Sequence, residues 1–500
     1  MKIKYIYIAL SVAFLSSCTK LDENIYDKVP ADEFFALPGA AASSLASVYA
    51  QMPGNWDGVG YAGADRGWYD LNEMSADYQV VPHRTTGDWE LDFARLYKRE
   101  WLPSDGFMNN TWNWLYKSIY RANRSIAQLE TAKADPSAIA EAKVLRAFFY
   151  YLLIDDFGDV PFFTVNDTPV EQVPQAKRKE VYDFVVSELL ANIDQLSSTK
   201  GGNYYGRFNK WAAYSLLAKV YLNAQVYTGT PMWNECLAAC NKVSEGGFSL
   251  HSGAADASNK LGYKYYELFG DVLPDDETIL AIYVTADIVG RNIFTVRSLG
   301  GTDGTNLFGA GAWNGSIVPQ AFVEKFSNTD IRKRQFRYGA NPYGPQPAGF
   351  INYSLEVLSL DNPGALPNAG ARNQKFFPVA PISNGGSNDF PIYRYADILL
   401  MKAECNVRLG SAAVGKPFID QVRERAGLNA LTAAPTLDNI YDERGFELTW
   451  EGHRRQDMIR FGKFLLAHDF APAVGPFRLL FPIPTAALNA NKLLIQNPGY

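Results

Sequence analysis

Charged side chains are packed unusually densely between residues 438 and 464, where the sequence is DNIYDERGFELTWEGHRRQDMIRFGKF. Paired carboxylates such as Glu447 and Glu451 could be the general acid and base of a glycosidase. They could instead form ion pairs with Arg454 and Arg455 at a corner where two helices meet. No strand end and no substrate-binding aromatic residues flank them, so the sequence favours a structural corner.

Other patterns that carry chemistry are absent from the sequence. The glycines of residues 300–304 lack the lysine and the helix start of a phosphate-binding loop. The four histidines are scattered, and none lies near a strained serine turn. Residues 271–277 are acidic but lack the ligand spacing of a helix-loop-helix calcium site, which favours a solvated turn. The sequence therefore favours binding over catalysis, and we expect no catalytic residue, no cofactor and no metal ion.

Two segments combine a tryptophan with polar residues that suit a sugar. The first is HRTTGDW, residues 83–89. Arg84 and Asp88 offer charged hydrogen-bond partners for hydroxyl groups, and Trp89 offers a flat ring on which the apolar face of a sugar can stack. These three residues are candidate ligand contacts.

The second segment is GAGAWNGS, residues 309–316, where glycines flank Trp313 and Asn314. Neither segment has the helical periodicity that would bury its tryptophan between paired helices. We therefore predict that both segments are loops and that Trp313 and Asn314 contact the ligand. The alternative is that each tryptophan is pinned to the scaffold and only supports its loop.

The composition is that of a folded protein that does not bind nucleic acid. Of the 500 residues, 47% are hydrophobic and 20% are charged, and the formal net charge is −6. The 30 Phe, 29 Tyr and 10 Trp are more than a core alone explains. Surplus aromatic residues suit either a carbohydrate ligand or a large hydrophobic interface.

The N-terminus has the pattern of a lipoprotein signal peptide. Lys2 and Lys4 precede a short apolar run, residues 6–15, which ends in Leu-Ser-Ser-Cys. The run is too short to span a bilayer. A cysteine directly after the small residues matches the bacterial lipobox, so we predict that Cys18 is lipidated and begins the mature chain. An ordinary signal peptide with an incidental cysteine is the alternative.

An internal repeat indicates helical hairpins. Small and large residues recur with the same spacing in three places: Ala142, Leu145, Ala147 and Tyr150; Ala213, Leu216, Ala218 and Tyr221; and, more loosely, Ala396, Leu399, Met401 and Glu404. Small residues at these offsets let paired helices approach closely, as in tetratricopeptide hairpins. The predicted pairs are residues 112–130 with 137–155, 178–196 with 208–226, and 392–409 with 415–426. The expected fold is therefore mainly α, a tetratricopeptide-like scaffold of helical hairpins.

Residues 246–390 interrupt this pattern, because they are rich in Gly, Asn and Pro. Short β-like runs occur at residues 278–284, 292–296 and 375–380. Loops of this length in a compact protein tend to carry function. The predicted organisation is a signal peptide (1–17), an N-terminal helical-repeat region (18–245), a loop-rich region with short strands (246–390) and a C-terminal helical region (391–500).

Several motifs together resemble the SusD/RagB family. Besides residues 438–464 they are WNWLYKSIYRANRSI (112–126), EAKVLRAFFYYLLIDDFGDVPF (141–162), RFNKWAAYSLLAKVYLNA (207–224), PIYRYADILLMKAECNVRLG (391–410) and LLFPIPTAALNANKLLIQNPGY (479–500). The resemblance covers almost the whole mature chain. It implies a tetratricopeptide-like scaffold whose irregular region holds the ligand.

The resemblance also implies a function. Members of the family are surface lipoproteins that bind nutrients for import across the outer membrane. We therefore expect a lipid-anchored protein on the extracellular face of the outer membrane, which binds an oligosaccharide or another nutrient. It would pass this ligand to a SusC-like TonB-dependent barrel. The alternatives are an enzyme acting on extracellular polysaccharide, and a peptide- or protein-binding helical-repeat scaffold.

Overall fold

The computed structural model describes residues 39–54, 60–63, 65–83, 89–285, 290–339, 349–361, 368–379, 382 and 385–500. The predicted signal peptide, the lipidation site Cys18 and the candidate contacts Arg84 and Asp88 lie outside these residues.

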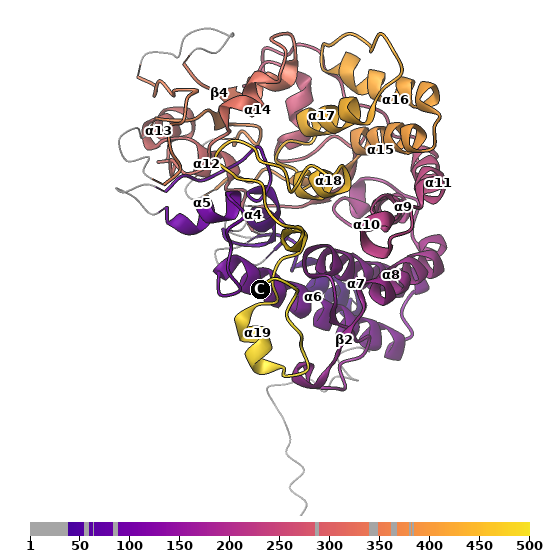
Figure 1. Cartoon of the computed structure of the whole chain (residues 1–500). Coiled ribbons are helices and arrows are strands. Elements are labelled where there is room, and N and C mark those ends of the chain that lie inside the picture. The colour runs from indigo at the N-terminus through magenta and orange to yellow at the C-terminus, as the bar shows by residue number, and fades with distance from the viewer. Residues whose placement is uncertain are drawn as a thin grey trace, which may run out of the picture.

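The described chain is mainly helical (Figure 1). Its longer helices are α3 (Ala40–Tyr49), α6 (Gly106–Thr131), α7 (Pro136–Phe157), α8 (Arg178–Asn192), α9 (Lys210–Leu222), α11 (Trp233–Ser244), α15 (Tyr395–Arg408), α16 (Ala412–Arg425) and α17 (Leu437–Glu447). Its shorter helices are α4 (Trp68–Glu73), α5 (Leu91–Tyr97), α10 (Ala224–Thr228), α12 (Phe294–Ser298), α13 (Gly301–Phe308), α14 (Gln320–Glu324), α18 (Arg454–Arg460) and α19 (Thr485–Ala490). Figure 1 shows the long helices gathered on one side and α12, α13, α14 and β4 on the other.

Two of the three predicted helical hairpins are confirmed, and the third, residues 178–196 with 208–226, is a minor contact. Helix α6 packs on α7, α7 also packs on α8, and α15 packs on α16. Helices α8 and α9 are in contact, but α9 packs more extensively on α11. In the first repeat, Ala142, Leu145, Ala147 and Tyr150 are all fully buried, because small residues at these positions let the helices approach each other.

Local sequence explains where α7 begins and ends. The side chain of Asp135 accepts a hydrogen bond of 2.8 Å from the backbone N–H of Ser137 and so caps the helix. Pro136 occupies the first helical turn, where no intrahelical bond requires its missing N–H. Gly158 follows the helix with φ of 75°, a conformation that glycine adopts without steric cost.

The described residues also form three two-stranded antiparallel ladders. They are β1 (Val160–Pro161) with β2 (Gln175–Ala176), β3 (Thr278–Ile282) with β6 (Phe390–Arg394), and β4 (Phe336–Arg337) with β5 (Arg372–Asn373). The predicted strand at 278–284 is confirmed as β3. The strand predicted at 292–296 was wrong, because helix α12 begins at Phe294. Near the strand predicted at 375–380, the strand pairing lies just earlier in the chain, in β5. Short apolar runs do not distinguish strand from buried helix, and β6 was missed for the same reason.

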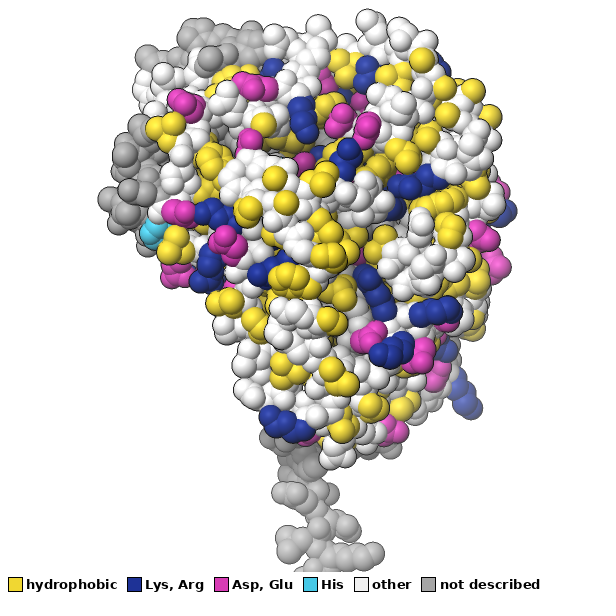
Figure 2. Space-filling view, viewed as in Figure 1, with side chains coloured by type: hydrophobic (Ala, Val, Ile, Leu, Met, Phe, Trp, Pro, Cys, Tyr) yellow, Lys and Arg dark blue, Asp and Glu magenta, His cyan; other side chains and the backbone are white. Residues whose placement is uncertain are grey.

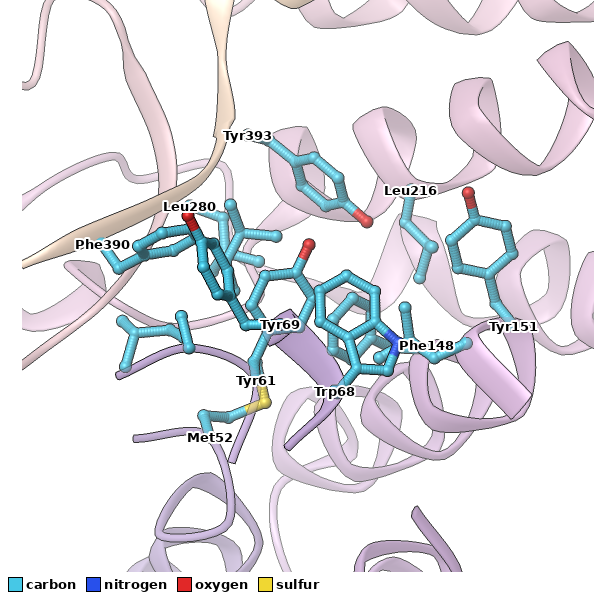
Figure 3. Packing of buried hydrophobic residues seen from close by; sticks show 14 of the residues in the cluster. Met52, Tyr61, Trp68, Tyr69, Phe148, Tyr151, Leu216, Leu280, Phe390 and Tyr393 are labelled. Carbon is cyan, nitrogen blue, oxygen red and sulfur yellow. The ribbon is translucent and has the colours of Figure 1, made fainter. Parts of the chain in front are cut away.

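Aromatic packing joins the loops near the N-terminus to the helices and to β6. Tyr61 and Trp68 stack with ring centroids 4.1 Å apart, and Tyr61 also contacts Phe148 of α7 and Phe390 of β6 (Figure 3). Tyr69 in α4 packs edge-on against the same Phe390. Tyr61, Trp68 and Tyr69 are thus fixed to the scaffold.

Candidate ligand-binding site

The dense charge around Glu447 and Glu451 is a buried corner between α17 and α18. Glu447 is fully buried, and the exposed fraction of Glu451 is 1%. Glu451 accepts hydrogen bonds from Lys375 at 2.6 Å and from Arg394 at 2.6 and 2.8 Å. Neither carboxylate is open to a substrate, as expected of a structural corner.

The charge state of Glu447 also argues against catalysis. Burial alone would raise the pKa of this carboxyl, but Arg425, Arg394 and Arg332 surround it and hold the pKa well below its ordinary value. A general acid must hold a proton near the working pH. Glu447 cannot do so while these three guanidinium groups face it.

The two tryptophan segments meet in the structure. The indole Nε1–H of Trp89 donates a hydrogen bond of 2.9 Å to the backbone carbonyl of Trp313. The Trp89 ring lies edge-on to Phe93 of α5, with centroids 5.7 Å apart. A Cβ atom at Gly315 would lie 2.6 Å from the Trp89 ring, so the second segment needs glycine at this position to accept the first.

Trp89 and Trp313 differ in their exposure. The exposed fraction of Trp89 is 7%, whereas Trp313 is only partly buried. Trp89 is therefore not the open, solvent-facing ring that the sequence predicted. Trp313 is the more exposed of the two, and Trp89 supports the loop that carries it.

Backbone hydrogen bonds hold Trp313 and Asn314 against α12. The Trp313 N–H donates to Val296 O at 2.9 Å, and the Asn314 N–H donates to Leu299 O at 2.8 Å. Asn314 has φ of 53°, in the left-handed region that asparagine adopts more readily than most residues. Both side chains are thus displayed from a fixed backbone.

Arg372 orients the amide of Asn314. The guanidinium of Arg372 donates to Asn314 Oδ1 at 2.8 Å and to Ala369 O at 2.9 Å, and it lies 4.6 Å from the ring centroid of Tyr353. The Tyr353 hydroxyl in turn accepts a hydrogen bond of 2.8 Å from the N–H of Gly300. Arginine can only donate, so Oδ1 must be the acceptor and the amide nitrogen of Asn314 remains as a donor.

We call the place where the two tryptophan segments meet, with Trp89, Trp313 and Asn314, the Trp313 junction. It offers an aromatic ring and an oriented hydrogen-bond donor. The segments predicted from the sequence come together through Trp89, Trp313 and Gly315. The predicted contacts Arg84 and Asp88 stay predictions. Sequence reasoning missed Arg372 and Tyr353, because they lie in the loop-rich region and no local pattern distinguishes them.

A separate cavity of about 400 Å³ lies between α3 and β3. Its lining is largely apolar and includes Leu45, Phe208 and Leu280. Two polar groups at its wall, Tyr49 and Arg207, already bind the carboxylate of Glu141. It offers few partners for hydroxyl groups and suits a sugar less well than the Trp313 junction.

Within the described ranges, no group of three or more His, Cys, Asp or Glu side chains is arranged to hold a metal ion. The cysteines in these ranges, Cys236, Cys240 and Cys405, are buried free thiols. No described helix combines the length and the apolar character that a membrane crossing requires.

Comparisons with known proteins agree with this architecture. Residues 316–474 match a family model described as "SusD family", and residues 59–222 match one described as "Starch-binding associating with outer membrane". The chain is 28% identical to a SusD-like protein of Formosa agariphila over 444 residues, 79% of this chain and 80% of that protein. It is 24% identical to the starch-binding protein SusD of Bacteroides thetaiotaomicron over 508 residues, 88% of this chain and 86% of that protein.

A solved structure shares the fold. It is the surface glycan-binding protein A from Bacteroides thetaiotaomicron in complex with laminarihexaose, which is 21% identical, with a TM-score of 0.69. The match covers 91% of this chain and 98% of that chain. The predicted mainly α, tetratricopeptide-like fold is thereby confirmed.

Proposed function

Because the chain belongs to the SusD family, we propose that it binds a glycan at the Trp313 junction and passes it to a SusC-like TonB-dependent transporter. A relative that is named a starch-binding protein supports a glycan as the ligand. Lipid anchoring at Cys18 and a position on the extracellular face of the outer membrane belong to the same proposal.

The observation that carries this proposal is the pairing of Trp313 with Asn314. Sugars are strongly hydrated, so a site must replace water at the hydroxyl groups while it covers an apolar face of the ring. The partly buried indole supplies the apolar surface, and the amide of Asn314, held by Arg372, supplies a directional donor. The backbone bonds to α12 fix both before the ligand arrives, which lowers the entropic cost of binding.

Binding without catalysis is part of the proposal. The most acidic cluster is buried and ion-paired, and Glu447 is held ionised by three arginines. The protein is therefore expected to bind polysaccharide without cleaving it.

The test is incubation of the purified protein with a glycan panel, read by calorimetry and by an assay for new reducing ends. Binding without product supports the proposal, whereas new reducing ends would make the protein an enzyme. A protein that binds no glycan but captures peptides would be a helical-repeat scaffold instead.

Two further experiments address the anchor and the partner. Cys18→Ser should release a soluble protein from the membrane fraction, and external protease should digest the wild type on intact cells. Resistance to that protease would contradict the outward orientation. Affinity purification from solubilised outer membranes should recover a TonB-dependent barrel, and recovery of the bait alone would contradict the transport partnership.

A further inference from the structure

We infer that the Trp313 junction selects uncharged glycans over glycans that carry carboxylate or sulfate groups; this rests on the proposed glycan-binding function. The basis is the arrangement of charge around the two tryptophan segments. A site for an anionic sugar needs an available cation, usually an arginine that can form paired hydrogen bonds with the acid group.

Arg66 is linked to Trp89 through Phe93, and acidic residues surround its guanidinium. Its guanidinium lies 4.8 Å from the ring centroid of Phe93, which packs against Trp89. Arg66 forms ion pairs with Asp65 at 2.5 Å, with Asp92 at 3.3 Å and with Glu90 at 3.6 Å. One guanidinium thus faces three carboxylates, and an incoming acid group would have to compete with all of them.

Two arginines near Trp313, Arg297 and Arg372, also bind partners within the protein. Arg297 is fully buried and forms two hydrogen bonds with Asp70, at 2.7 and 2.8 Å, while its backbone carbonyl accepts from Gly315. Arg372 is also fully buried, beneath Asn314. These two guanidinium groups hold the loops in place and are not presented to a ligand.

Two further ion pairs involve elements next to the two segments. Lys98, which follows α5, pairs with Asp361 at 2.5 Å, and Arg337 pairs with Asp303 of α13 at 3.1 Å. In the ion pairs named here, six carboxylates face four cations: Asp65, Asp70, Glu90, Asp92, Asp303 and Asp361 face Arg66, Lys98, Arg297 and Arg337.

The most exposed charged side chain in this set is a carboxylate. The exposed fraction of the Glu90 side chain is 74%, against 28% for Arg66 and 0% for Arg297. Figure 2 shows acidic and basic side chains interleaved over α5. An anionic glycan that stacked on Trp313 would approach the segment that carries the exposed Glu90, while the described arginines around that segment, Arg66 and Arg297, are already paired with carboxylates.

Uncharged hydroxyl groups, in contrast, are matched by the amide of Asn314 and by the aromatic ring. The charge balance therefore favours a neutral glycan.

The experiment compares matched ligands on one backbone. Oligosaccharides from the glycan that binds best in the panel are titrated calorimetrically as the neutral form and as carboxymethylated and sulfated derivatives, at about 20 and 500 mM salt. The neutral form should bind at least about tenfold more tightly, and its dissociation constant should not change with salt. Tighter binding of a charged derivative, weakened by salt, would overturn the inference and leave glycan binding intact.

The variant Glu90→Lys tests whether charge, rather than the shape of the site, causes the selection of neutral glycans. If repulsion by this carboxylate contributes to selection, the substitution should raise the affinity for the charged derivatives relative to the neutral form by several-fold. Glu245→Lys, in an exposed position after α11, is the matched control and should leave this ratio unchanged. An unchanged ratio in Glu90→Lys would refute the electrostatic explanation. Failure of every glycan to bind, neutral or charged, would refute the proposed function itself.

Discussion

The indole nitrogen of Trp89 donates its hydrogen to the backbone carbonyl of Trp313, across 224 residues of sequence. The sequence predicted that both tryptophans contact the ligand, but this bond gives them different roles. Trp89 is buried against Phe93 and Gly315 and holds the second segment, while Trp313 presents part of its ring to solvent. This division leads to opposite expectations for the two tryptophans.

Trp313→Ala should weaken glycan binding with little effect on stability. Loss of the stacking surface should cost on the order of 1–3 kcal/mol, which is about tenfold or more in the dissociation constant. The ring is already partly exposed, so the melting temperature should change little. Calorimetric titration and thermal unfolding measure the two effects. Trp211→Ala removes a similarly half-buried tryptophan from α9 and should leave affinity unchanged; equal affinity in Trp313→Ala would place the site elsewhere.

Trp89→Ala should destabilise the protein, because it empties a buried site. Removing a buried tryptophan typically costs roughly 3–5 kcal/mol, and it would also remove the bond to Trp313. Trp89→Phe should retain most of the packing and lose the hydrogen bond, so its unfolding free energy should lie between those of Trp89→Ala and the wild type. Chemical denaturation checks this order. An alanine variant of wild-type stability would mean that the ring is exposed in solution.

The helical hairpins could be predicted because their signal is local. The repeat around Ala142 and Leu145 is visible within one turn of helix, and the cap at Asp135 is visible within three residues. The strand pairing of β3 with β6 could not be predicted, because it joins segments more than 100 residues apart and both runs are short and apolar.

The candidate site was predictable only in part, for the same reason. The residue types in the two loops suggested Trp313 and Asn314, since a tryptophan beside polar and glycine residues suits a sugar. The burial of Trp89 depends on the absence of a side chain at Gly315. The orientation of Asn314 depends on Arg372, 58 residues further along. Neither relationship leaves a pattern in the local sequence.

Glu451→Ala should strongly destabilise the fold. The substitution leaves Lys375 and Arg394 buried without this carboxylate, and loss of one partner from a buried ion pair costs about 3–5 kcal/mol. Asp183→Ala breaks the exposed pair of Lys179 with Asp183 on α8, where a loss of at most about 1 kcal/mol is expected. Urea denaturation of both variants provides the comparison. A stable Glu451→Ala variant that had lost only ligand binding would place the site at this corner instead.

Glu73 provides a prediction about pH. This residue of α4 is fully buried, and burial raises the pKa of its carboxyl from 4.5 to about 8. Between these values the unfolded chain has released the proton and the folded protein still holds it, so this group lowers stability as the pH rises. Below pH 4.5 both states are protonated, and the penalty is absent.

Glu73→Gln should therefore stabilise the protein increasingly as the pH rises from about 5 to 8, because glutamine cannot ionise. The difference in unfolding free energy between variant and wild type should grow over this range by on the order of a few kcal/mol. Other buried carboxyls also titrate, but their contributions cancel in the difference. Glu171→Gln, at an exposed position, should show no such trend. A constant offset for Glu73→Gln at every pH would mean that Glu73 is ionised in the folded protein, since only a proton retained on folding makes the difference depend on pH.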